Sequence, residues 1–169
     1  HEIADMLQKN EISIKIDDSN KSPGFKFAEA EVNGIPLRIE IGPRDLDNHK
    51  VTVVRRDTRE KASYDYDEKL VTVVRDLLEK MQQDMYEKAL ARRNSLTFEA
   101  HTLEEVETIM NKHPGFIKAM WCGDLACEMK MKEIRGTKSR CILEEKAIDD
   151  HCVVCGKKAK HLVMWGIQY

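Results

Sequence analysis

Four cysteines close to the C-terminus have the type and the spacing of metal ligands. They form two close pairs separated by twenty-four residues, namely Cys122 and Cys127, then Cys152 and Cys155. Two pairs of thiolates that fold together give the tetrahedral donor set of a structural Zn²⁺ site. A glycine follows one cysteine of each pair, where it lets backbone amides turn towards the sulfur. We therefore predict a structural zinc ion with no catalytic position, because four thiolates leave no open site for water or substrate.

Other roles are open to the cysteines and to their neighbours. A Cys-x-x-Cys pair can be a redox dithiol, but Cys152 and Cys155 do not open a helix after a strand, and a second pair is present. His151 and His161 flank this pair and are alternative ligands, although four thiolates already complete a site. The fifth cysteine, Cys141, lies in a strand-like segment and is predicted to be a small buried hydrophobic residue.

Composition limits the class of protein. The 169 residues are 41% hydrophobic and 34% charged, with a formal net charge of -2, so nucleic-acid binding needs a local surface rather than a global basic charge. No apolar run approaches a membrane span, and the N-terminus is no signal peptide. An unpaired cysteine beside a zinc site favours a reducing compartment, and we expect a cytoplasmic protein without membrane contact.

Two domains are expected to position these residues. Residues 1–95 predict an α/β layer with some parallel strand pairing, and residues 96–169 a small α+β unit that a metal can staple. A helix over 67–95, without Gly or Pro, is expected to join them. In the first domain the patterns predict helices over 1–9 and 23–33 and strands over 12–16, 35–41, 50–55 and near 64. In the second, a capping box at Thr102 and Glu105 predicts a helix over 103–110, before a strand-rich remainder.

Several motifs together resemble prolyl-tRNA synthetases of the archaeal or eukaryotic type. The central segment is Gly34–Leu46 (GIPLRIEIGPRDL), with Pro23–Phe27 (PGFKF) before it and Val54–Thr58 (VRRDT) after it. The cysteine spacing, Gly136–Cys141 (GTKSRC) and a terminal Tyr169 match the same branch, which carries a C-terminal zinc-binding domain. The resemblance covers nearly the whole chain, and the motifs are specific in combination.

The resemblance implies a mixed-sheet anticodon-binding domain followed by the zinc domain. The family's enzymes are class II ligases that activate proline with ATP and Mg²⁺, attach it to proline tRNA, and act as cytoplasmic homodimers. Their catalytic domain precedes this region, and the class II motifs do not occur in this sequence, so we expect no aminoacylation by the chain alone. The first strand of the anticodon-binding domain is also expected to be missing. In this branch the terminal residue, here Tyr169, lies near the catalytic domain; the alternative is an ordinary last strand that ends in tyrosine.

The family resemblance implies that Glu40 reads a guanine of the proline anticodon. A carboxylate can accept the N1–H and N2–H donors of the base in a splayed single strand. Arg44 can donate to guanine O6 and N7, and Arg38 shares a strand face with Glu40 because the two are two residues apart. The alternatives are a solvent-facing strand residue for Glu40 and a local turn pair of Arg44 with Asp45.

Further contacts to RNA are expected from cations and one aromatic ring. Lys26, Arg55 and Arg56 can bind phosphates, which position RNA without specifying its sequence. Phe25 can stack on a base. The alternatives are a solvated hairpin tip for the arginines and a core position for the phenylalanine.

Two other functions compete with a ligase segment. One is a stand-alone interaction module built on an anticodon-type domain. The other is a zinc-ribbon protein that contacts DNA or other RNA, for which clustered cations around the metal are expected. Lys157, Lys158 and Lys160 supply only a small cluster of that kind.

Overall fold

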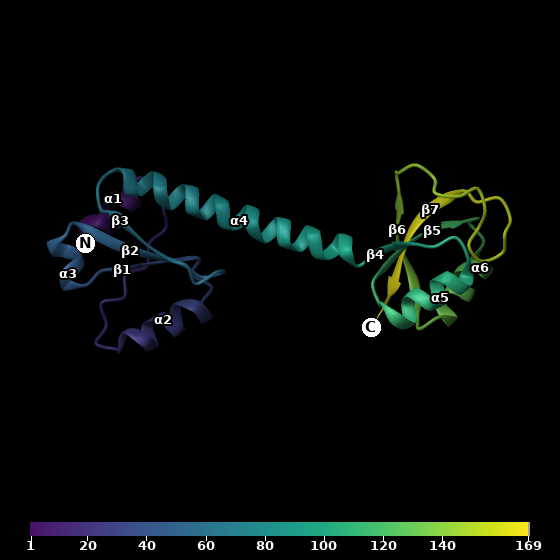
Figure 1. The fold of residues 1–169 in the computed structure, drawn as a ribbon, viewed down its shortest axis with the longest axis horizontal. Coiled ribbons are helices and arrows are strands. Elements are labelled where there is room, and N and C mark those ends of the chain that lie inside the picture. Colours follow the sequence, from purple (N-terminus) through teal and green to yellow (C-terminus); the bar gives the residue numbers. More distant parts are fainter. Residues whose placement is uncertain (169) are drawn as a thin grey trace. The chain divides into compact units, whose positions relative to one another are not determined.

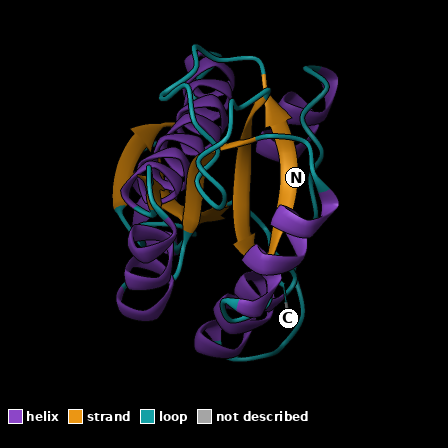
Figure 2. Cartoon of the chain, turned by 90° about the vertical axis from the view of Figure 1, so that its right-hand side faces the viewer, coloured by secondary structure: helices purple, strands orange, loops and turns teal. Residues whose placement is uncertain are grey.

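The computed structural model describes residues 1–168 and divides the chain into two units, His1–Glu87 and Lys88–Tyr169. Helix α4 (Lys69–Ser95) runs from the first unit into the second, which confirms the expected joining helix (Figure 1). Both units combine helices with a sheet, so the α/β prediction is confirmed (Figure 2). The predicted domain boundary at residue 95 coincides with the end of α4 and stays a prediction. No helix among residues 1–168 is long and apolar enough to cross a membrane.

The first unit contains one three-stranded antiparallel sheet in the order β1-β2-β3. Three short helices accompany it, together with the start of α4. In chain order the elements are α1 (Glu2–Lys9), α2 (Pro23–Val32), β1 (Leu37–Glu40), α3 (Pro43–Asp47), β2 (Lys50–Arg55) and β3 (Lys61–Asp65). Pro23 is at the first position of α2, where its missing N–H has no intrahelical partner to lose.

Alternation along the strands gives this sheet two different faces. Leu37 and Ile39 pack into the core with Val51 and Val53 of β2, and that core also contains apolar residues of α1 and α4. Arg38 and Glu40, one position out of phase, point to the opposite face because successive strand side chains alternate. The apolar face is therefore the core of the unit, and the other face is free to carry polar groups.

The strand predicted over residues 12–16 is wrong. Ile12 and Ile14 pack against the core, as their alternation indicates, but these residues belong to no helix or strand. Alternation produces a strand only where a neighbour supplies hydrogen-bond partners, and no ladder to residues 12–16 occurs in the described part of the chain. The parallel pairing predicted within residues 1–95 is also wrong: the described strand pairs of the first unit are all antiparallel, and a parallel pair occurs in the second unit.

The second unit contains a mixed four-stranded sheet in the order β4-β5-β7-β6. The pair β4–β5 is parallel, and the two other pairs are antiparallel. Its elements after α4 are β4 (Thr97–Glu99), α5 (Leu103–Lys112), β5 (Phe116–Trp121), α6 (Leu125–Glu133), β6 (Thr137–Leu143) and β7 (His161–Ile167). The capping box of α5 is confirmed: the Thr102 side chain accepts from the Glu105 N–H at 3.2 Å.

Trp165 is the largest fully buried side chain of the second unit. It packs with Ile117, Met110 and Met131, which come from β5, α5 and α6. Its Nε1–H points to the Ala119 carbonyl at 3.4 Å, so the indole nitrogen keeps a partner inside the core. Two helices and two strands therefore meet at one ring.

A large-to-small substitution in this core should destabilise the second unit. We expect Ile117→Ala to lower the free energy of unfolding by about 2–5 kcal/mol, because the side chain is fully buried and leaves a cavity. Ile142→Ala is the matched control: the side chain is 57% exposed, and we expect a loss below about 1 kcal/mol. Both tryptophans lie in this unit, so urea titration followed by tryptophan fluorescence measures its unfolding. Equal losses would contradict the assigned core.

Candidate metal centre and candidate nucleic-acid interface

The four predicted cysteines come together in the second unit. The Sγ atoms of Cys122, Cys127, Cys152 and Cys155 all lie within 4.8 Å of one another. Two of the separations are 3.7 Å, between Cys122 and Cys127, and 3.8 Å, between Cys155 and Cys122. A tetrahedral thiolate site with metal–sulfur bonds of about 2.3 Å has sulfur–sulfur edges of about 3.8 Å. The donor set and the spacing therefore fit a four-thiolate metal ion.

Local structure places each pair of thiols. Cys122 directly follows β5, and Cys127 lies in the first turn of α6, whose N-cap Asp124 accepts from the Ala126 N–H at 2.9 Å. Gly123 has a φ of 90°, a left-handed conformation that glycine adopts without strain, and it turns the chain between strand and helix. The N-terminal end of α6 also favours a negatively charged thiolate.

The second pair, Cys152 and Cys155, lies on a tight turn that two backbone hydrogen bonds close. The Gly156 N–H donates to the Cys152 carbonyl at 2.9 Å, and the Cys152 N–H donates to the Lys157 carbonyl at 2.7 Å. Gly156 has a φ of 69°, so the second glycine of the motif also takes a left-handed conformation. The Val153 N–H bonds to the Met120 carbonyl at 3.0 Å, which ties the turn to β5 and so brings the two pairs together.

The thiols differ in how easily they ionise. Burial raises the pKa of Cys122 and of Cys127, and neighbouring thiols raise that of Cys127 further. At Cys152 burial also opposes ionisation, but backbone N–H groups around the turn outweigh it and lower the pKa to about 7. A metal ion offsets the burial cost by supplying the positive charge that the buried thiolates lack.

The alternative ligands stay outside this cluster. The Nδ1 atom of His151 is 3.3 Å from a carboxylate oxygen of Asp149, and the His161 ring lies 6.1 Å from that of Trp121. The prediction that Cys141 is buried is wrong. It is exposed because β6 is an edge strand of the sheet and its register shifts between Ser139 and Cys141.

Three lysines surround a shallow hollow beside the metal ligands. Lys157, Lys158 and Lys160 line it together with Cys122, Gly123 and Asp124. Four thiolates around a divalent ion would carry a net charge of -2, which these cations would offset together with the charge of Asp124. With such an ion bound, the hollow has no large excess of positive charge for nucleic acid.

A polar cluster occupies the non-core face of the sheet in the first unit. The Arg38 guanidinium donates through Nε and Nη2 to Oε1 of Glu40 at 3.0 and 2.9 Å. Its carbon lies 4.0 Å from the centre of the Phe27 ring, a cation–π contact. Lys61 approaches Glu40 Oε2 at 3.3 Å, and Glu31 approaches Arg38 at 3.8 Å. We call these five residues the polar cluster.

Strand register and helix periodicity bring the polar cluster together. Arg38 pairs across the sheet with Val54, which pairs with Lys61, so the two cations lie on the same face with one residue between them. Phe27 and Glu31 are four apart on α2 and share one helix face. Sequence reasoning identified Arg38 and Glu40 but missed Glu31 and Lys61. The four-residue spacing on α2 is the signal that could have suggested Glu31.

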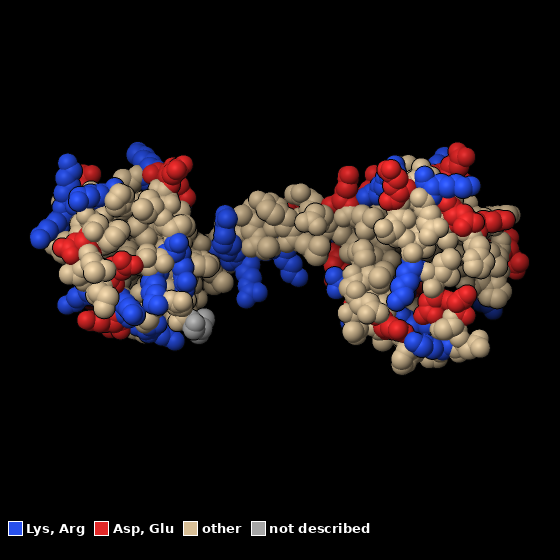
Figure 3. Space-filling model, turned by 180° about the vertical axis from the view of Figure 1, so that it is seen from behind, with Lys and Arg blue, Asp and Glu red and all other residues tan. Residues whose placement is uncertain are grey.

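Several predicted RNA contacts lie outside the polar cluster. Arg44 is exposed on α3 and Arg56 is exposed just after β2. Phe25 is 57% exposed, which excludes a core position, and the Lys21 ammonium lies 4.7 Å from its ring centre. Lys26 donates to the Asp17 carbonyl at 3.0 Å. In the view of Figure 3, cationic and anionic side chains are interspersed over each unit.

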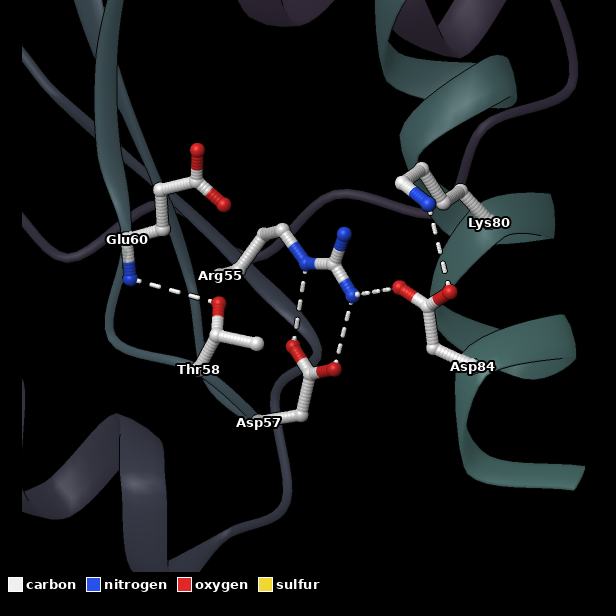
Figure 4. A network of polar contacts seen from close by, with 6 residues as sticks. All are labelled: Arg55, Asp57, Thr58, Glu60, Lys80 and Asp84. Atoms are coloured by element: carbon white, nitrogen blue, oxygen red, sulfur yellow. Dashed lines mark hydrogen bonds and ion pairs between the residues drawn. The ribbon is translucent and has the colours of Figure 1, made fainter. Parts of the chain in front are cut away.

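The structure corrects the prediction that Arg55 binds phosphate. Its side chain is 5% exposed, and it donates to both carboxylate oxygens of Asp57 and to Asp84 of α4 (Figure 4). The cause is strand parity: Arg55 is in phase with Val51 and Val53, which face α4 and the core. The hydrogen bonds that Arg55 donates to the carboxylates of Asp57 and Asp84 raise its pKa. Tyr169 lies outside the described residues.

Two protein families match this chain over separate ranges. Residues 1–84 match the family described as "Anticodon binding domain", and residues 103–169 match "Prolyl-tRNA synthetase, C-terminal". The ranges correspond to the unit with the polar cluster and to the unit with the four cysteines. The fold and the two sites therefore define a tRNA-synthetase type of chain with an anticodon-binding unit.

Individual relatives narrow this class. The chain is 50% identical to a proline–tRNA ligase of Clostridium novyi (strain NT) and 50% identical to one of Lachnoclostridium phytofermentans, over 92% of its own length in each case. It is 48% identical, over 94% of its length, to a proline–tRNA ligase of Clostridium botulinum (strain Loch Maree / Type A3). The chain belongs to the prolyl-tRNA synthetase family, and it spans about a third (33%) of the length of these relatives.

The buried arginine should make stability depend on pH in the acid range. Hydrogen bonds from Arg55 hold the pKa of Asp57 and of Asp84 below the ordinary value. A carboxylate with a lowered folded pKa stabilises the fold above its unfolded pKa, about 3.9 for Asp, and this contribution is lost as the pH falls through the folded value.

We therefore expect the free energy of unfolding to fall less for Asp57→Asn than for the unchanged chain between about pH 5 and about pH 2.5. Urea titrations followed by far-UV circular dichroism measure it at each pH. Other carboxyl groups are common to both proteins, so the difference isolates Asp57. Parallel pH profiles would contradict the ion pair.

Proposed function

We propose that this chain is the anticodon-recognising and C-terminal part of a proline–tRNA ligase, whose whole enzyme activates proline with ATP and attaches it to proline tRNA. One combined observation carries the proposal. The chain matches both families, and it is also about 50% identical to named proline–tRNA ligases. The chain corresponds to a third of those relatives, and it contributes RNA recognition rather than the chemical step.

The polar cluster supports recognition of guanine in the first unit. Oε1 of Glu40 already accepts from Arg38, whereas the partner of Oε2, at 3.3 Å, is the ammonium of Lys61, whose side chain is 54% exposed. Oε2 can therefore accept from the N1–H or N2–H of a base, and Lys61 can swing to guanine O6 or to a phosphate. Phe27 supports the guanidinium of Arg38, so the pair that holds Glu40 keeps its orientation when RNA binds.

Arg44 and Arg56 complete the proposed RNA surface as exposed cations, with Lys26 and the exposed ring of Phe25. Phosphate contacts by the cations position the RNA, and stacking by Phe25 holds a base without regard to its sequence. Arg55 is excluded from this surface by its burial.

Glu40→Gln tests base recognition directly. The substitution keeps the shape of the side chain but replaces one acceptor with a donor that faces a guanine donor. We expect binding of a stem-loop RNA with a UGG anticodon to weaken by about tenfold, a loss of roughly 1.4 kcal/mol, measured by fluorescence anisotropy.

The matched control is Glu60→Gln, which makes the same change of charge at an exposed position of the β2–β3 turn. Loss of a negative charge alone should leave RNA affinity equal or raise it slightly. If both variants bind as well as the unchanged chain, or weaken equally, Glu40 does not read the base.

For the second unit we propose a structural zinc ion at the four cysteines. Tetrahedral sulfur spacing and the closed set of four thiolates support zinc, because Zn²⁺ prefers this geometry and these ligands. A metal that joins the end of β5 to the turn of Cys152 and Cys155 would add directly to the folding free energy of the unit. No step of catalysis is assigned to it.

One zinc ion per chain is the expected metal content. Cys152→Ser should lose most of the metal and lower the midpoint of urea unfolding followed by tryptophan fluorescence, because a hydroxyl is a poor zinc ligand. Cys141→Ser should keep both the metal and the midpoint, since Cys141 is exposed and lies outside the cluster. Protein grown with zinc but free of metal, with a Cys152–Cys155 disulfide, would favour the redox alternative.

The remaining features of the whole enzyme are also proposals. Family membership supports a homodimer and a catalytic domain that binds ATP and Mg²⁺, and it supports a position of Tyr169 near that domain. Family membership also supports a cytoplasmic location. Domain limits at 1–95 and 96–169 place the proposed boundary at the end of α4.

A further inference from the structure

The turn between β2 and β3 supplies two cations to acidic residues on the face of the polar cluster. Arg59 lies 3.6 Å from Glu31, and Lys61, at the start of β3, lies 3.3 Å from Glu40. Each acidic side chain therefore has Arg38 as one cationic partner and a residue of the turn or its edge as a second. If the turn moved, the charges around Glu31 and Glu40 would change together.

This turn has a conformation that its own sequence does not favour. Arg59 has a φ of 60°, in the left-handed region that residues with a side chain avoid. Two backbone hydrogen bonds close the turn: Arg59 N–H to the Arg55 carbonyl at 2.9 Å, and Arg55 N–H to the Glu60 carbonyl at 3.0 Å. Additional contacts must stabilise the turn against relaxation at Arg59.

Arg55 and Asp57 provide such a contact. Arg55 donates to the two oxygens of Asp57 at 3.1 and 2.7 Å, so the start of the turn is joined to the end of β2 by two parallel hydrogen bonds. Asp84 accepts from the same guanidinium at 2.7 Å and is itself 3.2 Å from Lys80 of α4 (Figure 4). Asp57 thus acts on the turn, whereas Asp84 acts on the helix side of the same arginine.

We propose that Arg55 and Asp57 are positioning residues for RNA recognition: their paired hydrogen bonds hold the β2–β3 turn so that Arg59 and Lys61 face Glu31 and Glu40. The inference rests on the proposed RNA-binding function of the polar cluster. Neither residue touches RNA in this arrangement, because Arg55 is buried and both Asp57 oxygens are used.

Asp57→Asn and Asp84→Asn form a matched pair for the test. Each removes one negative charge and one carboxylate partner of Arg55, and loss of a negative charge by itself favours RNA binding. We expect Asp57→Asn to weaken binding of the UGG stem-loop about fivefold, because the turn is released. Asp84→Asn leaves the Arg55–Asp57 pair intact, and we expect binding within about twofold of the unchanged chain.

Two further measurements separate positioning from general stability. Urea unfolding should show losses of similar size for the two variants, whereas amide hydrogen exchange at Arg59 should accelerate only in Asp57→Asn, where its bond to the Arg55 carbonyl is loosened. If Asp57→Asn does not fold, Asp57→Glu replaces it, since its carboxylate is displaced by one methylene and should also weaken binding.

Equal RNA affinity of the two Asn variants, or unchanged affinity in folded Asp57→Glu, would overturn the positioning role. Failure of the unchanged chain to bind the UGG stem-loop in preference to one with both guanines replaced would instead overturn the proposed function. The two failures are therefore distinguishable in one set of titrations.

Discussion

The two-residue alternation of the first sheet is the constraint on which both its core and its proposed recognition surface depend. Leu37, Ile39, Val51 and Val53 turn one face into the core that α1 and α4 cover. The same geometry forces Arg38 and Glu40 to the other face, where α2 brings Phe27 and Glu31. The polar cluster and the core are thus two consequences of one register. A shift of one residue would exchange them and bury charges without partners.

In the first unit, strand register brings the functional side chains together. In the second unit, we propose that a metal ion joins the segments that carry the four cysteines. The sheet and two helices of this unit share a core around Trp165. The segment between β6 and β7, by contrast, contains no helix or strand. Cys152 and Cys155 on that segment meet Cys122 and Cys127 at the end of β5. Four thiolates this close together repel one another in the absence of a cation, so the proposed metal ion would couple its own binding to folding.

Sequence patterns predicted what is local and repeated. Proline and the capping box marked the starts of α2 and α5, and the cysteine spacing predicted a cluster that the structure brings together. Features that depend on distant partners were not predictable. The alternation of residues 12–16 lacks a partner strand, and Cys141 is exposed only because β6 lies at an edge. Helix α6 was not predicted, because apolar Leu125 and Met129 lie on its exposed side and the sequence therefore shows no clear apolar stripe.

Arg55 shows how strand parity and charge together decide a role. In the sequence, Arg55 and Arg56 are adjacent and look equivalent, yet the side chain of Arg55 is buried and that of Arg56 is exposed. Arg55 continues the phase of Val51 and Val53 and is buried, where only a charged partner makes its guanidinium tolerable. Asp57 and Asp84 supply that partner from the turn and from α4. Arg55, which the sequence suggested as a direct phosphate contact, is thereby proposed to position the polar cluster from inside the fold.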